Sequence, residues 1–181
     1  MRTLVLGLAL TAAAMMIAVV GKGNIATAHP LAQSSAAPAD ITMAKTFTTA
    51  AEVQGLLAKA KAERKEGQVQ VAERILSLAP YTVNLEYRPI DGAVAVHEKE
   101  AELVYVIDGG GALVTGGKVV GEKRTNPTNL SGTAIDGGST QTISKGDFAI
   151  IPEGTPHQFK PANGLLVLMT FHVPRPVAVA Q

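Results

Sequence analysis

The stretch that decides the fold is GDFAIIPEGTPHQF, residues 146–159. It runs as an apolar strand into a Pro-x-Gly turn at residues 152–154 and then continues with a histidine, His157. The chain has only four histidines, and this one directly follows a tight turn on a segment with a buried pattern. That placement predicts a metal ligand on the inner wall of a small β-barrel.

A second stretch, GAVAVHEKEAELVYVIDGGG at residues 92–111, supplies two further candidate ligands. Strand alternation puts His97 on one face with Ala93 and Ala95, and a short turn at residues 99–101 leads to Glu102. His97 and Glu102 can therefore meet across a hairpin on the same side of the sheet. With His157 they form two imidazoles and a carboxylate, a ligand set that divalent Fe, Mn, Ni, Cu or Zn can use.

These two stretches resemble the cupin superfamily of small β-barrels. The second cupin motif, Gly-x5-Pro-x-Gly-x2-His, is matched by residues 146–157 without a gap. The first motif ends His-x(3,4)-Glu-x6-Gly and is matched by His97, Glu102 and Gly109. The resemblance covers about residues 80–173. It implies a double-stranded β-helix (jelly-roll) barrel, a metal held by His97, Glu102 and His157, and a homodimer formed through barrel edges.

The sequence departs from the family pattern at two positions. Ala95 stands where the first histidine of a His-x-His pair is usual, and Pro161 stands where an Asn is usual. A register that uses His97 and Lys99 as the pair leaves too short a step to Glu102, so the register with Ala95 is preferred. A site with three ligands binds metal more weakly than one with four. The alternative is a barrel that uses the same polar groups to bind an organic ligand.

The N-terminal residues carry the pattern of an export signal. Arg2 precedes an apolar run at residues 4–20, and Ala26-Thr27-Ala28 is a small-x-small cleavage pattern. Residues 1–28 are therefore predicted to be a signal peptide, with a mature chain that starts at His29 and is periplasmic or secreted. A retained membrane anchor is the alternative, because the apolar run approaches spanning length.

The remaining chain divides by pattern. Residues 29–48 are rich in Ala, Ser and Pro and predict a flexible arm. Thr49 to Glu52 is a capping box that opens an amphipathic helix at about 49–66, within a lead-in that ends at residue 79. A barrel at 80–174 and a tail at 175–181 follow. The predicted strands are 69–78, 81–88, 93–98, 102–107, 111–115, 118–120, 129–135, 139–144, 147–151, 155–160 and 164–173.

Many short strands between glycine-rich turns predict an all-β, single-domain fold with one N-terminal helix. The polar residues 121–139 are longer than a minimal barrel needs and are interpreted as a solvated hairpin excursion; Lys123 and Arg124 there could meet an anionic substrate. His172 shares a strand face with Leu166, Leu168 and Thr170. It is interpreted as a strand-end residue rather than a fourth ligand.

Composition limits the classes of function. The chain of 181 residues has 46% hydrophobic residues, 4% aromatic residues and a net charge of +1. It has no basic stripe and few aromatic side chains for stacking bases, which argues against a nucleic-acid partner. It has no cysteine, which excludes thiolate chemistry.

Three functional classes remain open. The first is a metal-dependent enzyme, dioxygenase-like or isomerase-like, that acts on a small molecule through His97, Glu102 and His157. The second is a non-catalytic protein that binds a sugar or an organic acid, and the third is a structural module. The first is favoured because suitable ligands stand at three positions, although no general base is apparent beyond them.

Overall fold

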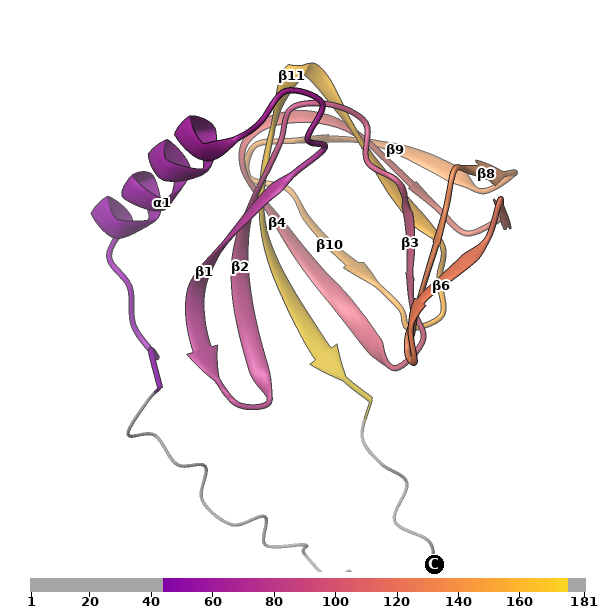
Figure 1. Ribbon diagram of the computed structural model, residues 1–181, viewed down its shortest axis with the longest axis horizontal. Coiled ribbons are helices and arrows are strands. Elements are labelled where there is room, and N and C mark those ends of the chain that lie inside the picture. The colour runs from indigo at the N-terminus through magenta and orange to yellow at the C-terminus, as the bar shows by residue number, and fades with distance from the viewer. Residues whose placement is uncertain (1–43, 176–181) are drawn as a thin grey trace, which may run out of the picture. The chain divides into compact units, whose positions relative to one another are not determined.

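The computed structural model describes residues 44–175 (Figure 1). The predicted signal peptide, most of the predicted arm and nearly all of the predicted tail lie outside the described residues. The described part has one helix, α1 (Ala50–Glu63). Its strands are β1 (Val71–Leu78), β2 (Tyr81–Arg88), β3 (Val94–His97), β4 (Glu100–Thr115), β5 (Lys118–Val120), β6 (Lys123–Asn126), β7 (Asn129–Gly132), β8 (Ala134–Asp136), β9 (Ser139–Ser144), β10 (Phe148–Ile151) and β11 (His157–Pro174).

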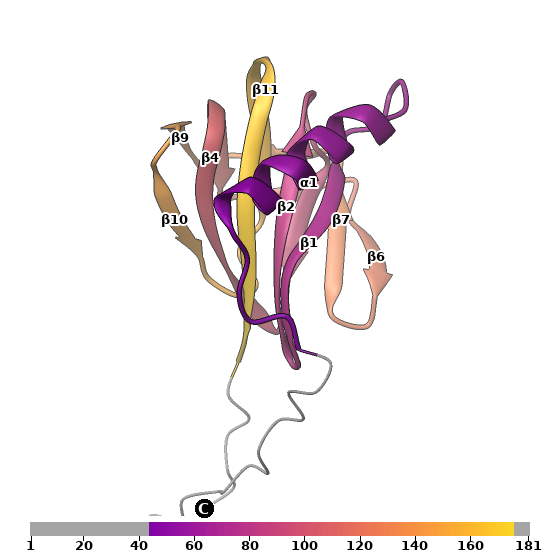
Figure 2. The same cartoon turned by 90° about the vertical axis from the view of Figure 1, so that its left-hand side faces the viewer.

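Helix α1 begins at the predicted capping box. The Thr49 hydroxyl accepts a hydrogen bond from the backbone N–H of Glu52, and the Glu52 carboxylate accepts one from the backbone N–H of Thr49 at 2.7 Å. The helix ends at Glu63, three residues before its predicted end at residue 66. Its buried residues, Leu57 and Ala60, pack on the sheet, and Figure 2 shows α1 lying across the outer face of β1 and β2.

Two long strands organise the sheet. β4 and β11 pair antiparallel from end to end, with Thr115 opposite His157 and Glu100 opposite Pro174. The first half of β4 also pairs with β10, and the second half of β11 pairs with β2, which pairs with β1. We call this half of the sheet the first wall.

The second wall is built from the other halves of the same two strands. The second half of β4 pairs with β9, and β11 pairs at its first residue, His157, with Ala95 of β3. β3 continues to β7, and β7 continues to β6. The nine strands thus form one antiparallel sheet that folds over between its two walls, and a separate ribbon of β5 and β8 lies beside it.

Both long strands bend where the walls meet, and glycine makes this bend possible. Gly109 has φ +71°, and a Cβ there would collide with the backbone of Leu165. A Cβ on Gly111 would collide with the backbone carbonyl of Lys160. Because β4 and β11 approach this closely, a side chain at either position would push the strands apart.

The predicted strand breaks at these bends are wrong. The glycine-rich segments predict turns between 102–107 and 111–115 and between 155–160 and 164–173, whereas β4 and β11 each continue through the predicted gap. The predicted strand 129–135 is divided at Thr133 into β7 and β8, and residues 123–126 form an additional strand, β6. The sheet begins at Val71, while the sequence placed the start of the barrel at residue 80.

The core between the walls follows the alternation along the long strands. Its buried residues are Val104, Val106, Leu113, Ile143, Ile151, Phe159, Leu166 and Leu168. Val167 points to the other side of β11 and joins the cluster beneath α1. Alternating positions of β11 therefore separate the inner core from the helix-covered face. The predicted all-β fold with one N-terminal helix is confirmed. Within residues 44–175, α1 lacks the length and the apolar character that a membrane-spanning helix requires.

Candidate metal centre

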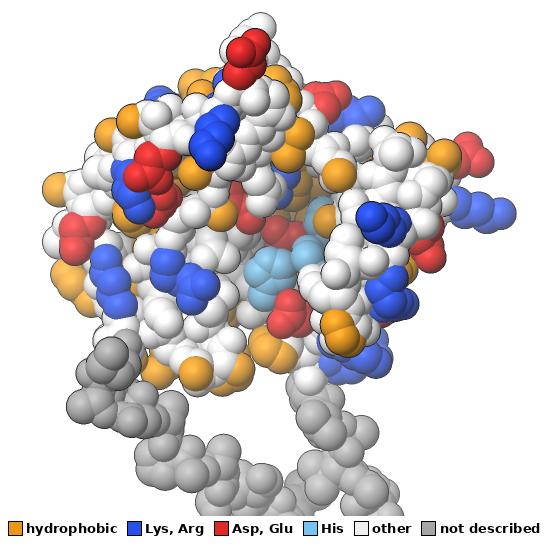
Figure 3. Space-filling view, in the orientation of Figure 1, with side chains coloured by type: hydrophobic (Ala, Val, Ile, Leu, Met, Phe, Trp, Pro, Cys, Tyr) orange, Lys and Arg blue, Asp and Glu red, His pale blue; other side chains and the backbone are white. Residues whose placement is uncertain are grey.

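Three predicted ligands meet at the end of the fold opposite the strand bends. His97 is the last residue of β3, Glu102 lies near the start of β4, and His157 is the first residue of β11. Oε2 of Glu102 lies 2.9 Å from Nε2 of His157 and 3.6 Å from Nε2 of His97. They line a cavity of about 340 Å³. In Figure 3 the histidine side chains (pale blue) gather in a hollow beside acidic side chains.

The Glu102 carboxylate is buried, and one of its oxygens has no hydrogen-bond partner. Its side chain is only 3% exposed, which excludes a surface role for this charge. Oε2 has no hydrogen-bond partner, although Nε2 of His157 lies 2.9 Å away. A buried, uncompensated carboxylate is costly. A cation between the donor atoms would remove that cost.

The histidine tautomers direct lone pairs at the same carboxylate oxygen. The Nδ1–H of His157 donates to the backbone carbonyl of Thr155 at 3.1 Å, and the Nδ1–H of His97 donates to Oδ1 of Asn129 at 3.2 Å. In a neutral ring this leaves Nε2 without a proton. Two bare Nε2 atoms and a carboxylate oxygen therefore converge, and this donor set fits a divalent transition metal.

The electrostatics favour the ligating protonation states. Burial acts to raise the pKa of Glu102, but the contact with His157 and the positive charge that the surrounding imidazoles carry when protonated outweigh it and hold this pKa below its usual value. Burial lowers the pKa of His97, and the neighbouring histidines reinforce that shift against the opposing effect of Glu102. An ionised Glu102 and a neutral His97 are the forms that bind metal.

His172, which the strand pattern predicts to be a strand-end residue rather than a ligand, lines the same cavity. Its ring centroid lies 4.6 Å from that of His97, in an edge-on arrangement, and its Cα is the cross-strand partner of Glu102. The signal was present in the sequence, because His172 shares the face of Leu166 and Leu168, which point into the core. Oε2 of Glu100 lies 3.3 Å from Nδ1 of His172, and no motif in the sequence singles out Glu100.

A buried ion pair forms another part of the cavity wall. The Arg88 guanidinium lies 2.6 Å from Oε2 of Glu86, and the Thr170 hydroxyl donates to Oε1 of Glu86 at 3.1 Å. Arg88 also lies over the ring of Phe159, with 4.9 Å to the centroid. Both carboxylate oxygens of Glu86 thus have polar partners, unlike those of Glu102. The ion pair adds polar surface to the cavity, and its two charges balance each other.

The polar excursion contributes to the cavity. Thr125, Asn129 and Ser131, from the hairpin of β6 and β7, line it. Arg124 instead pairs with Glu98 at 2.7 Å on the surface. The interpretation of residues 121–139 as merely solvated is therefore incomplete, because one side of the hairpin encloses the site.

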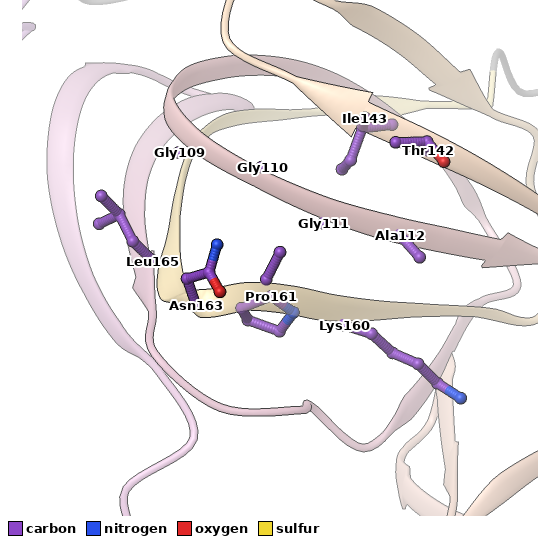
Figure 4. A pocket seen from close by; sticks show the side chains of 11 residues that line it. Gly109, Gly110, Gly111, Ala112, Thr142, Ile143, Lys160, Pro161, Asn163 and Leu165 are labelled. Carbon is purple, nitrogen blue, oxygen red and sulfur yellow. The ribbon is translucent and has the colours of Figure 1, made fainter.

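A larger hollow of about 630 Å³ lies at the strand bends, away from the histidines (Figure 4). It is lined by Gly109, Gly110, Gly111, Ala112, Thr142, Ile143, Lys160, Pro161, Ala162, Asn163 and Leu165. Lys160 is the one ionisable side chain among these lining residues. The cluster of potential metal donors therefore belongs to the smaller cavity at the other end.

No protein-family model and no curated protein matches the chain. Similar solved structures include a Klebsiella pneumoniae protein with a double-stranded β-helix domain (TM-score 0.45, 16% identity, covering 61% of this chain and 82% of that one). KdgF from Halomonas sp. matches with a TM-score of 0.45 and 13% identity, over 62% of this chain and 87% of that one. Fe(II) HppE matches with a TM-score of 0.46 and 15% identity, over 60% of this chain and 52% of that one. At these identities the similarity concerns the fold alone. The chain is structurally similar to double-stranded β-helix proteins, the architecture that its cupin motifs predict.

Proposed function

We propose that this protein is an exported, cupin-like protein in which His97, Glu102 and His157 hold a divalent transition metal that binds a small molecule. The observation that carries the proposal is the buried Oε2 of Glu102, which lacks a hydrogen bond and is approached by two Nε2 atoms. Export rests on the signal-like pattern of residues 1–28.

The chain's own residues would prepare the site for this role. Asn129 and the carbonyl of Thr155 fix the orientation of the two rings, as outer-shell partners of ligating histidines commonly do. Glu102 supplies a negative charge that partly balances a divalent cation. A bound metal would supply Lewis acidity or a site for O2.

The cavity suits a small polar molecule. Its volume of about 340 Å³ falls at the lower end of small-molecule sites. Thr125 and Ser131 offer hydroxyl groups, and Arg88 offers donors not used by Glu86. We therefore expect a compact ligand with several oxygen atoms, such as an organic acid or a sugar, whether it is a substrate or is simply bound.

A non-catalytic binding protein is the second candidate. Its support is that Glu86, the further carboxylate deep in the cavity, is engaged by Arg88 and Thr170 and is poorly placed to act as a base. A dioxygenase-like or isomerase-like enzyme would need a proton acceptor from the ligands or the substrate itself.

Metal analysis tests the proposal directly. Protein stripped with a chelator would be reloaded with Fe(II), Mn(II), Ni(II), Cu(II) or Zn(II), and bound metal would be counted after gel filtration. We expect one ion per chain in the wild type and a large loss of affinity in Glu102→Gln. Glu98→Gln is the matched control, because Glu98 is a nearby glutamate that pairs with Arg124 on the surface. A wild type that binds none of these ions would overturn the metal site.

Ligand screening separates the two candidates. Metal-loaded protein would be tested by thermal shift with organic acids and sugars, and each hit would then be followed for turnover by mass spectrometry. Conversion that is lost in Glu102→Gln supports an enzyme. Binding without conversion supports the non-catalytic protein.

A further inference from the structure

The described residues contain two groups of three potential metal donors, not one. In each group, all three donor atoms lie within 4.8 Å of one another. The inner triad is His97, Glu102 and His157, and the outer triad is His97, Glu100 and His172. The two triads share His97.

Burial orders the two triads along a path from solvent. The side chains of Glu102 and His157 are each 3% exposed, that of His97 is 18% exposed, and those of His172 and Glu100 are 21% and 39% exposed. The outer triad is therefore more exposed to solvent than the inner one. An ion that enters the cavity from solvent meets the outer triad first.

The outer triad contains a donor that has no structural partner. Nδ1 of His172 is buried and makes no hydrogen bond, although Oε2 of Glu100 lies 3.3 Å away. Together with Oε2 of Glu102, it is one of two buried side-chain polar atoms without a partner among residues 44–175. Unsatisfied buried polar atoms in a native protein call for an explanation such as an absent ion. One such atom in each triad gives the two triads the same signature.

The sharing of His97 determines how the triads can work together. A neutral imidazole has one unprotonated nitrogen, and Nδ1–H of His97 is engaged by Asn129. His97 can therefore ligate one ion at a time. Both triads cannot be filled at once with all three of their ligands.

We propose that His97, Glu100 and His172 form a second, outer divalent-metal site that captures an ion at the cavity mouth and passes it to the inner triad by ligand exchange at His97. The delivery step rests on the proposed function of the inner triad. The outer site itself rests only on its own three residues. Its greater exposure makes it the weaker, faster-exchanging site.

Variants that disable the inner triad allow metal binding by the outer triad to be measured on its own. Zn(II) or Co(II) binding would be measured by calorimetry in His157→Ala and in His157→Ala/His172→Ala. We expect His157→Ala to retain one weakly bound ion, and the added His172→Ala change to reduce that affinity by about tenfold or more. Equal binding by the two variants would overturn the outer site. Glu100→Gln provides the same test at the most exposed residue of the outer triad, with Glu98→Gln as the matched control.

Uptake kinetics test the delivery step. In a stopped-flow experiment, a metal-free protein would compete for Zn(II) with a coloured chelator. Glu100→Gln and His172→Ala should slow uptake by a larger factor than they weaken equilibrium binding. Weaker equilibrium binding with unchanged uptake would overturn delivery and make His172 a ligand of the inner ion.

Failure of the inner site gives a different result. If His157→Ala binds metal as tightly as the wild type and His172→Ala does not, the ion occupies only the outer triad. That outcome overturns the inner triad and supports the outer site. A wild type that binds no ion overturns both.

Discussion

Ala95 and His157 are direct cross-strand partners, paired where β3 meets the start of β11. Residues paired in this way place their Cβ atoms about 4.5–5.5 Å apart on one face of the sheet. Ala95 also lines the cavity. Residue 95 is therefore beside the inner triad, at the position where the cupin pattern has its additional histidine.

Ala95→His should tighten metal binding. A fourth donor beside His157 would add a ligand bond, and we expect the affinity for Zn(II) to rise by about tenfold, or about 1.4 kcal/mol. Competition with a chelator of known affinity measures the gain. Ala93→His is the matched control, since Ala93 also lines the cavity but precedes β3 and is two residues further from His97 in sequence. No gain would return the register with Lys99 to consideration.

Asn129→Ala should weaken metal binding without removing a ligand. The amide oxygen of Asn129 accepts the Nδ1–H of His97 and thereby fixes the ring and its tautomer. Loss of such an outer partner commonly costs about 10- to 100-fold in affinity. Calorimetry on the variant checks this, with Asn84→Ala as a control that removes only a surface hydrogen bond to Arg74. Unchanged affinity would show that Asn129 does not orient His97.

Acid should destabilise the metal-free protein. The pKa of His97 is lowered by burial from an ordinary value of 6.5, so below about that pH the unfolded chain binds a proton that the native chain excludes. The pKa of Glu102 is lowered from 4.5 despite burial, because of its imidazole neighbours, so its contribution is present above that pH and is lost as pH falls through the native value. Both effects make the free energy of unfolding decrease with falling pH.

Urea unfolding between pH 8 and pH 4 measures this dependence. His97→Gln should flatten the part of the curve just below pH 6.5, because it removes the group that titrates there. A wild-type curve that is level from pH 8 to pH 5 would contradict a buried, neutral His97.

Leu57→Ala should test the attachment of α1 to the sheet. Leu57 is 6% exposed and packs with Ile75, Leu85 and Val167 beneath the helix. A buried Leu→Ala change costs about 2–5 kcal/mol of unfolding free energy. Leu56→Ala, at a partly buried neighbouring position, should cost less. Equal losses measured by urea unfolding would contradict the observed helix orientation.

The sequence predicts the fold class well, because the class depends on local patterns. The proximity of His97, Glu102 and His157 agrees with the expectation from the two cupin-like motifs, and their role as metal ligands stays a prediction. Strand alternation, the capping box at Thr49 and the short step from His97 to Glu102 are properties of neighbouring residues, whereas His157 belongs to a separate motif 55 residues after Glu102. The continuity of β4 and β11 could not be predicted in the same way. Gly109 and Gly111 carry the signals of turns, and only the close approach of the partner strand explains why the strands continue through them.

The role of His172 depends on a longer-range relationship. The alternation along residues 166–172 shows that its side chain faces inward, but the proximity to His97 follows from the return of β11 to the open end of the fold. The same holds for the contribution of the β6–β7 hairpin to the cavity, since its pairing with β3 joins residues far apart in sequence. Local patterns carry no information about such pairings.

The donors come from both walls of the folded sheet. His97 lies in the second wall, whereas Glu102, Glu100 and His172 lie in the first. An ion held by either triad would therefore link the two walls at the open end of the fold, opposite the bends of β4 and β11. The thermal stability of the protein should consequently rise with metal occupancy. Removing the ion should loosen the open end of the fold before it loosens the strand bends.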